Sequence, residues 1–435
     1  MARVEEAPTE ARGRWNSWSG GAGSGARRRI IAGALLIAAL FAVIQAVDYR
    51  QDVPSNDTYQ YARQTLRILG DSQAQAVHGA VVMFCQDSGQ SAARSATLDY
   101  GSSGSGLAYT SGYAHCLQTY RNGLTPSSPR YIAIFTTRPG YPLLAAPFAA
   151  AFGLRFGLWA VAMLCTLGAS FLVLLLLRAA GCGVMVALCG QALYLAAPTG
   201  YWGSRMLTDG PSLATTLLAL LGAWWLMQRR LRAGTAVLVA GLASGFVVRY
   251  SSEQLVALAL ALGALICLKW VPSARHRGAV LLAAVSGGGF VLSELLSTLL
   301  GWPGISESLQ DTFTRHFIRP DVSDPIGRLV RLNLHFWGYF PVSEPTALLA
   351  GGGLVALAVL LVRRDPAYGV LVVAVAATGI ATVAAHPLAS QSDRLMVAVW
   401  LLLALGLPRL LPSRAHSRPE EPAREQEPAY SAGTA

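Results

Sequence analysis

The segment "IIAGALLIAALFAVIQAV" (Ile30–Val47) decides the fold class, because it is apolar, carries no charge and is long enough for one membrane crossing. A helix needs about 20 apolar residues to cross about 30 Å of hydrocarbon. The basic triplet "RRR" (Arg27–Arg29) precedes it, as expected on the cytoplasmic side of a membrane. A cleaved signal peptide over 1–47 is the competing interpretation, but the long polar lead and the lack of a clear small-residue cleavage site favour a retained helix.

Apolar segments of this kind recur along the chain. Of its 435 residues, 53% are hydrophobic and 13% are charged, whereas soluble proteins carry about 25% charged residues. We therefore expect an all-α polytopic membrane protein with about ten transmembrane helices, within a range of about nine to twelve. The expected spans are 30–47, 157–177, 183–200, 213–228, 234–248, 254–270, 279–299, 345–362, 367–385 and 395–411.

We treat 30–411 as a single transmembrane domain with two large polar loops, 48–140 and 300–344. The segment "YPLLAAPFAAAF" (Tyr141–Phe152) is apolar but too short to cross, so it is expected to be a re-entrant or juxtamembrane helix. The Gly/Ser-rich segment "DYGSSGSGLAYTSGY" (Asp99–Tyr113) predicts a flexible part of the first loop.

The two ends of the chain, 1–29 and 412–435, contain many Pro, Glu, Arg and Ser residues and are expected to be disordered cytoplasmic tails. The net charge of +11 comes without a nucleic-acid-binding motif, so membrane topology and anionic lipid explain it better. With the N-terminus inside, the short outer loops hold only Arg205, Arg249 and Arg394, whereas the short inner loops hold nine basic residues: Arg178, Arg229, Arg230, Arg232, Lys269, Arg275, Arg277, Arg363 and Arg364. Both large loops then lie on the extracytoplasmic side.

Two of the six cysteines, Cys85 and Cys116, fall in the first large loop. Outside the cytoplasm they can form a disulfide, which would restrain the loop by about 3 kcal/mol in the chain-entropy model, and the sequence leaves this open. No CxxC or His-rich spacing predicts a zinc site. No cofactor follows from the sequence with certainty, and dependence on a divalent metal stays open.

Two acids on the predicted outer side are the candidate catalytic groups. Asp57 lies at a predicted helix N-cap in "SNDTYQYARQTLRILGD" (Ser55–Asp71), whose amphipathic pattern predicts a helix on the bilayer surface. Asp209 precedes Pro211 where a span begins. Each has a structural interpretation as a helix cap and a functional one as a general base or ligand.

Four outer arginines are candidate ligands for a phosphate, because a guanidinium binds phosphate bidentately: Arg138, Arg205, Arg249 and Arg394. The alternative for three of them is pairing with a local acid, as Arg205–Asp209, Arg249–Glu253 and Arg394–Asp393. For Arg138 the alternative is an interfacial side chain that extends toward water. His316 and His335 have no partner spacing that selects metal or catalysis, so a structural role is favoured.

These motifs together resemble a known family. The Asp after the first span is followed by "RPGYPLL" (Arg138–Leu144), by "TDGPSLA" (Thr208–Ala214) opening a later span, and by "SQSDRLMVAVWLLLA" (Ser390–Ala404) leading the last one. In this layout the chain resembles bacterial integral-membrane glycosyltransferases of the GT-C type, near the protein O-mannosyltransferases and the lipid A aminoarabinose transferases. The resemblance covers most of the chain, although its motifs are short.

The resemblance implies a sugar on a polyprenyl-phosphate carrier as donor, and transfer with inversion to an acceptor glycan, lipid or protein in the cell envelope. Together with the loop charges, which place both termini in the cytoplasm, it indicates a protein of the inner or plasma membrane with an extracytoplasmic active site. Asp57 matches the first-loop acid of the family, the proposed base, and Asp209 its second outer acid. Arg138 and Arg394 match positions that face the donor phosphate. The chain departs in having one first-loop acid instead of an Asp-Glu pair, and Asp393-Arg394 instead of Glu-Arg.

Two other function classes compete. A multi-pass transporter usually places binding charges near the bilayer midplane and often contains internal repeats, neither of which is evident in this sequence. A non-catalytic envelope-assembly protein would not need the set of acids and arginines. The sequence does not indicate which sugar or acceptor is involved.

Overall fold

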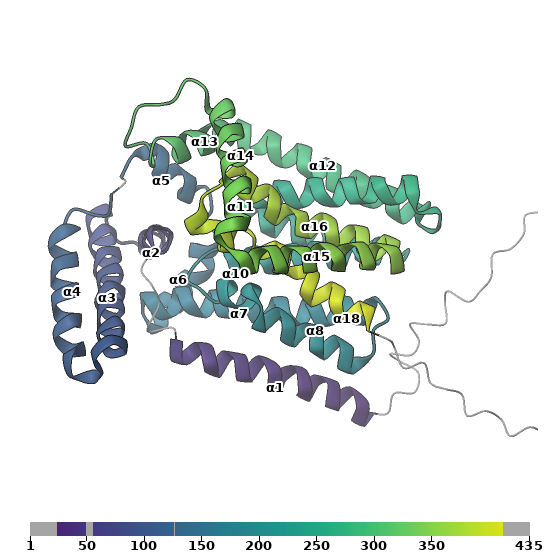
Figure 1. The fold of residues 1–435 in the computed structure, drawn as a ribbon, viewed down its shortest axis with the longest axis horizontal. Coiled ribbons are helices and arrows are strands. Elements are labelled where there is room, and N and C mark those ends of the chain that lie inside the picture. Colours follow the sequence, from purple (N-terminus) through teal and green to yellow (C-terminus); the bar gives the residue numbers. More distant parts are fainter. Residues whose placement is uncertain (1–23, 49–54, 126, 412–435) are drawn as a thin grey trace, which may run out of the picture.

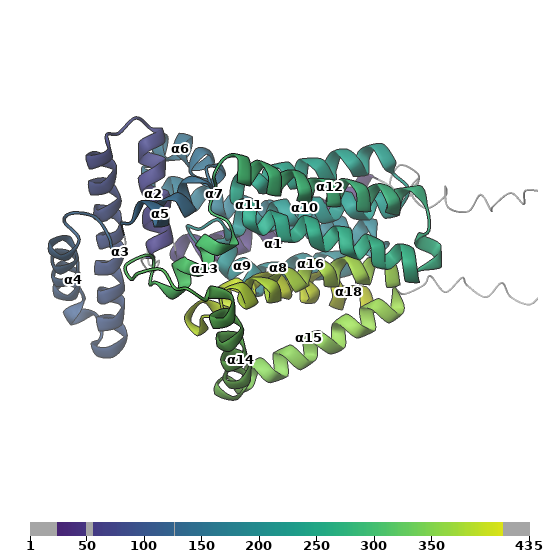
Figure 2. The ribbon, with the colours of Figure 1, turned by 90° about the horizontal axis from the view of Figure 1, so that it is seen from above.

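The computed structural model describes residues 24–48, 55–125 and 127–411. Its long helices lie side by side along one direction (Figures 1 and 2). Within the described residues, seven helices are long and apolar enough to cross a membrane, as expected of a polytopic membrane protein. They are α1 (Ser24–Asp48), α7 (Leu154–Ala179), α10 (Asp209–Met227), α11 (Leu231–Trp270), α12 (Arg277–Leu299), α15 (Pro345–Arg364) and α16 (Pro366–Ala385).

Helix α11 is 40 residues long in sequence but is folded back on itself at Arg249, whose φ of −162° and ψ of 83° are not helical. A Cβ on Gly245 would lie 2.7 Å from Cδ of Glu253. Eight residues along a continuous helix are about 12 Å apart, so the chain must reverse between them. This turn falls between the predicted spans 234–248 and 254–270.

Three shorter apolar segments complete the bundle: α6 (Gly140–Phe152), α8 (Val184–Ala196) and a last segment from Val397 to Leu410. The last segment is irregular, with a 3-10 turn at Val397–Trp400, a π-helical turn at Leu402–Gly406 and α18 (Leu407–Leu410). The predicted spans 183–200 and 395–411 correspond to α8 and to this segment. The count of about ten crossings stays a prediction.

Small residues allow the central helices to approach closely. A Cβ on Gly222 of α10 would lie 2.6 Å from Cα of Leu238 on α11, and one on Gly241 would lie 2.8 Å from Cα of Ala219. Around these contacts lie fully buried leucines such as Leu217. Helices packed in lipid gain little from apolar burial against one another and depend on such close backbone contact.

The polar segments lie across one end of the bundle, which we call the α2 end (Figure 1). Here α2, α3 and α4 run across the direction of the long helices in both views, and the connection from α11 to α12 lies at the opposite end (Figure 2). The elements of this end are α2 (Asn56–Ile68), α3 (Gln73–Tyr100), α4 (Ser105–Thr119), α5 (Pro129–Thr136), α9 (Pro198–Gly203), α13 (Ile305–Phe313), α14 (Pro325–Ser343) and α17 (Ser392–Leu395).

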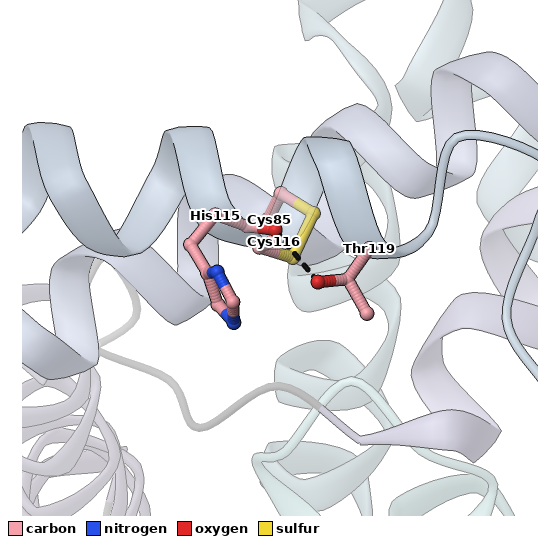
Figure 3. Close-up of a disulfide and its surroundings, with 4 residues drawn as sticks. All are labelled: Cys85, His115, Cys116 and Thr119. Atoms are coloured by element: carbon pink, nitrogen blue, oxygen red, sulfur yellow. Dashed lines mark hydrogen bonds between the residues drawn. A yellow bond between two sulfur atoms is a disulfide. The ribbon is translucent and has the colours of Figure 1, made fainter.

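Cys85 of α3 and Cys116 of α4 are joined by a disulfide, the pair that the sequence left open (Figure 3). Close to it, Thr119 donates a hydrogen bond to the carbonyl of His115 at 2.8 Å. The disulfide crosslinks α3 and α4 at the end of their hairpin that lies away from the connecting turn.

Three details differ from expectation. The segment 99–113 is not a flexible loop, because it forms the end of α3, a 3-10 turn and most of α4. The apolar face of α2, which was expected to contact the bilayer, contacts protein at Tyr61: this side chain is fully buried, and α2 packs against α3 and α6. Of the predicted tails, 24–29 belong to α1, while 1–23 and 412–435 lie outside the described residues.

Candidate functional site

Asp57 lies in the first turn of α2 but does not cap it. Ser55 is the N-cap, and its hydroxyl accepts a hydrogen bond from the backbone N–H of Thr58 at 3.1 Å. The Thr58 hydroxyl donates to the carbonyl of Met206 and fixes α2 against the segment before α10. The cap expected at Asp57 is therefore supplied by Ser55, and the Asp57 carboxylate is available for tertiary contacts.

Arg394 joins the two predicted acids. Its Nη1 donates to Oδ2 of Asp57 at 2.7 Å, and its Nε donates to Oδ2 of Asp209 at 2.9 Å. The side chain of Asp209 is 4% exposed, and that of Asp57 is 25% exposed. Asp57 is thus the member of this triad that remains accessible.

The electrostatics keep the pair charged. Burial favours the neutral acid at Asp57, but the charge of Arg394 and its hydrogen bond outweigh burial and lower the pKa of the carboxyl. Burial likewise disfavours the Arg394 cation, yet Asp209 and Asp57 outweigh it and raise the guanidinium pKa. Asp57 is therefore ionised at neutral pH.

Two more arginines surround the triad. Arg249, at the turn of α11, has its Nη1 3.6 Å from Oδ1 of Asp209. At Arg138, between α5 and α6, burial opposes the cation, but the interactions with Tyr61 and Asp57 outweigh burial and raise the guanidinium pKa. The cluster of Asp57, Asp209, Arg138, Arg249 and Arg394, called here the charge cluster, comes from five separate segments.

The arginines are not fully paired. Nε of Arg138 and Nε of Arg249 are buried and have no hydrogen-bond partner among the described residues. A buried donor without a partner costs about 1–3 kcal/mol, more when it is charged. Three guanidinium groups facing two carboxylates also leave one positive charge uncompensated. The charge cluster is therefore suited to an anion.

A cavity of about 60 Å³ extends from the charge cluster between α10, α11 and α16. Its wall includes Ser212 and Thr216 of α10 and Thr378 and Thr382 of α16. Each pair is spaced by four residues, which places both hydroxyls on one face of the helix. A larger groove of about 620 Å³, lined by residues of α2, α3, α6 and α7, contains no residue of the charge cluster.

For Arg249 and Arg394, the local pairings considered from the sequence are not the ones found. Arg249 and Arg394 contact Asp209 and Asp57 instead of their sequence neighbours. Glu253 is 4% exposed, and its Oε1 has no hydrogen-bond partner among the described residues. The guanidinium carbon of Arg205 lies 4.3 Å from the centroid of the Tyr201 ring.

Sequence reasoning missed the aromatic part of the site. Tyr61 hydrogen-bonds Thr208 and contacts the rings of Phe135 and Tyr141 edge-on. Tyr131 accepts a hydrogen bond from Asn56 at 2.9 Å. No sequence signal indicates these contacts, whereas the Ser/Thr pairs at four-residue spacing on two apolar helices could have indicated the cavity wall.

Within the part of the chain that the structure describes, no three His, Cys, Asp or Glu side chains lie close enough together to hold a metal ion. The two carboxylates of the charge cluster are both bound by Arg394, which leaves no obvious ligand set there. We therefore assign no chemical step to a metal.

Comparisons of the chain with protein-family models, with curated proteins and with solved structures find no match. The functional argument consequently depends on the geometry of the charge cluster and on the sequence motifs.

Proposed function

We propose that the protein is a glycosyltransferase that moves a sugar from a polyprenyl-phosphate carrier to an acceptor on the extracytoplasmic face of the membrane. The observation that carries this proposal is the charge cluster, in which Arg138, Arg249 and Arg394 face only two carboxylates at the end of a bundle of apolar helices. The cell-envelope acceptor is a glycan, lipid or protein.

The donor phosphate fits the uncompensated charge. The unpartnered Nε atoms of Arg138 and Arg249 offer hydrogen bonds that an anionic oxygen can accept. Fixed guanidinium groups in a site of low dielectric constant stabilise the charge that develops on a leaving phosphate. Because a phosphate is already a good leaving group, the reaction needs no strong general acid.

Asp57 is the proposed base. Its carboxylate is ionised and is the more accessible of the two acids in the charge cluster. It can accept the proton of the acceptor hydroxyl while that oxygen attacks the anomeric carbon from the face opposite the phosphate. Asp209, almost fully buried, holds Arg394 and Arg249 in place.

The arrangement of the helices is compatible with the membrane orientation proposed from the sequence. Both polar loops belong to the α2 end, and the basic connections between long helices, such as the one from α11 to α12, belong to the other (Figure 1). We propose that the α2 end faces the extracytoplasmic side of the plasma or inner membrane, with both termini cytoplasmic.

The test is donor consumption by the full-length protein in lipid nanodiscs, followed by chromatography of polyprenyl-phosphate sugars. The wild type should consume one of the donors, and Asp57→Asn should reduce the rate by at least about 100-fold. Asp99→Asn, an exposed acid on α3, is the matched control and should retain full activity.

Arg138→Gln should weaken donor binding and also lower the rate at saturation, because its proposed contact is with a phosphate that is already charged in the substrate and gains charge as it leaves. Arg121→Gln, an exposed arginine beyond α4, is its control. Unchanged turnover in Asp57→Asn would overturn the mechanism. Failure of the wild type to consume any donor, together with solute flux in vesicles, would favour the transporter.

A further inference from the structure

The turn after α13 holds His316 in an uncommon backbone conformation. Arg315, His316 and Phe317 have φ values of 54°, 62° and 62°, in the left-handed region that residues other than glycine rarely adopt. The backbone N–H of His316 donates to the carbonyl of Asp311 at 2.9 Å, and that of Phe317 donates to the hydroxyl of Thr314 at 2.8 Å. Such a conformation persists only where its surroundings fix it.

Arg130 of α5 makes contacts that help to hold the turn at His316 in this conformation. Its guanidinium donates to both carboxylate oxygens of Glu307 and to Asp321, all at 2.8 Å, and lies 4.3 Å from the centre of the Phe317 ring. The residues before and after the turn are therefore tied to the same helix. That helix also supplies Tyr131, which contacts the residue before Asp57.

In this position His316 forms a dyad with Asp311. Nδ1 of His316 lies 2.9 Å from Oδ1 of Asp311, and the imidazole packs on the ring of Tyr131 with the centroids 4.8 Å apart. Tyr131 in turn accepts the hydrogen bond from Asn56, the neighbour of Asp57. Since Nδ1 faces the carboxylate, proton exchange takes place at Nε2. The side chain is 41% exposed, so solvent reaches it.

We propose that His316, oriented by Asp311, is the second proton-carrying group of the site, which receives the acceptor proton from Asp57 and delivers it to solvent. This inference rests on the proposed glycosyl transfer. The acceptor O–H bond breaks and its oxygen bonds the anomeric carbon, while the bond from that carbon to the phosphate oxygen breaks with its electron pair on the phosphate. The proton passes from the Asp57 carboxyl through water to Nε2 of His316.

The direction of this transfer follows from the two environments. Arg394 lowers the pKa of Asp57 against the effect of burial, so its carboxyl does not retain the proton. The hydrogen bond from His316 to Asp311 raises the pKa of the imidazole above its usual value of about 6.5, so His316 accepts the proton readily. The other titratable groups that face His316 are Tyr131 and His386.

The experiment is the pH dependence of donor consumption by the full chain in nanodiscs. Turnover by the wild type should fall as the pH falls through the pKa of His316, because the imidazolium cannot accept a second proton. His316→Gln should no longer show this fall in turnover at acid pH, called here the acid limb, and its rate should be at least about tenfold lower than that of the wild type. Asp311→Asn should move the limb to lower pH, since the carboxylate that raises the pKa is gone. His335→Gln, an exposed histidine on α14, is the matched control and should behave as wild type.

A readout independent of turnover is NMR titration of ¹³C-labelled histidine in the full chain, with the His316 signal assigned by its loss in His316→Gln. A midpoint above about 6.5 that falls in Asp311→Asn supports the dyad. Turnover by His316→Gln with the rate and acid limb of the wild type overturns the inference and leaves the glycosyl transfer standing. A wild type that consumes no donor overturns both.

Discussion

The interface between α10 and α11 and the charge cluster are both buried, yet opposite interactions hold them. At the interface, Gly222 and Gly241 bring two backbones into contact, and the side chains around them are apolar. In the charge cluster, Arg394 binds two carboxylates while two further arginines keep unpaired Nε atoms. The contacts that we describe at the interface involve no unpaired polar group, whereas the charge cluster contains buried hydrogen-bond donors without a partner.

This difference separates stability from function. Close packing of small residues adds to the stability of a helical bundle. Buried ion pairs often add little net stability, because the cost of desolvation offsets the Coulombic attraction. A cluster that keeps an excess of positive charge is therefore better explained by a ligand than by folding. The following variants test that contrast, beginning with the largest expected effect.

Arg394→Met should destabilise the folded state by about 3–5 kcal/mol, because it leaves the carboxylates of Asp57 and Asp209 without their shared partner. Unfolding in a detergent titration, followed by tryptophan fluorescence, measures the loss. Asp57→Asn added to Arg394→Met should recover a part of it, since one unpaired charge is removed. A double variant that is less stable than Arg394→Met alone would contradict the ion-pair account.

The α3–α4 hairpin depends on a third kind of interaction, a covalent one. Cys85→Ser should destabilise it by about 3 kcal/mol, because the disulfide closes a loop with a sequence separation of 31 residues. Limited proteolysis of α3 and α4 should become faster, whereas Cys189→Ser, which removes an exposed free thiol, should change nothing. Equal proteolysis of both variants would show that the hairpin does not need the crosslink.

Gly222→Ala should destabilise the bundle by about 1–3 kcal/mol, because its Cβ would lie 2.6 Å from Cα of Leu238 and 2.8 Å from the carbonyl oxygen of Gly234. Neither atom can move without separating the helices. Gly168→Ala in α7 is the control, since a Cβ there meets no atom within 4 Å. The same detergent titration measures both, and equal midpoints would refute the close-packing account.

The pH dependence of stability should show the smallest effects, with opposite signs at two points of the α2 end. Arg394 lowers the pKa of Asp57 in the folded state against the effect of burial. The ionised Asp57 therefore contributes to the free energy of unfolding above about pH 4, and this contribution is lost as the pH falls through the folded pKa. His316 has a raised pKa, so its contribution is complete below about pH 6.5 and is lost as the pH rises through the folded pKa.

Thermal melting between about pH 3 and pH 9 measures both effects. Asp57→Asn should flatten the curve of melting temperature against pH at acid pH. His316→Gln should flatten it only slightly near neutral pH, because the His316–Asp311 pair is partly exposed to solvent. An acid side as steep in Asp57→Asn as in the wild type would assign acid unfolding to other carboxylates.

The fold was predictable where the signal is local. Blocks of apolar residues located the seven long helices and the turn at Arg249, because a hydrocarbon solvent leaves little freedom in length or composition. The Gly/Ser composition of 99–113 was misleading, since tertiary packing and the neighbouring crosslink hold a helix there in spite of low propensity.

The sequence by itself determined that the chain is helical and suited to a membrane. It also selected Asp57, Asp209, Arg138, Arg205, Arg249 and Arg394 as candidate site residues, five of which form the charge cluster. Only the tertiary structure decided their partners. Arg394 binds Asp209 and Asp57, which are 185 and 337 residues away in sequence, instead of its neighbour Asp393. The turn with positive φ at His316 forms a dyad with Asp311 that the sequence spacing does not predict. The reason is physical. Hydrophobicity is a property of each residue and can be read from the sequence, whereas the partner of a charged group depends on its distance from other groups in space, and therefore on how all the helices pack.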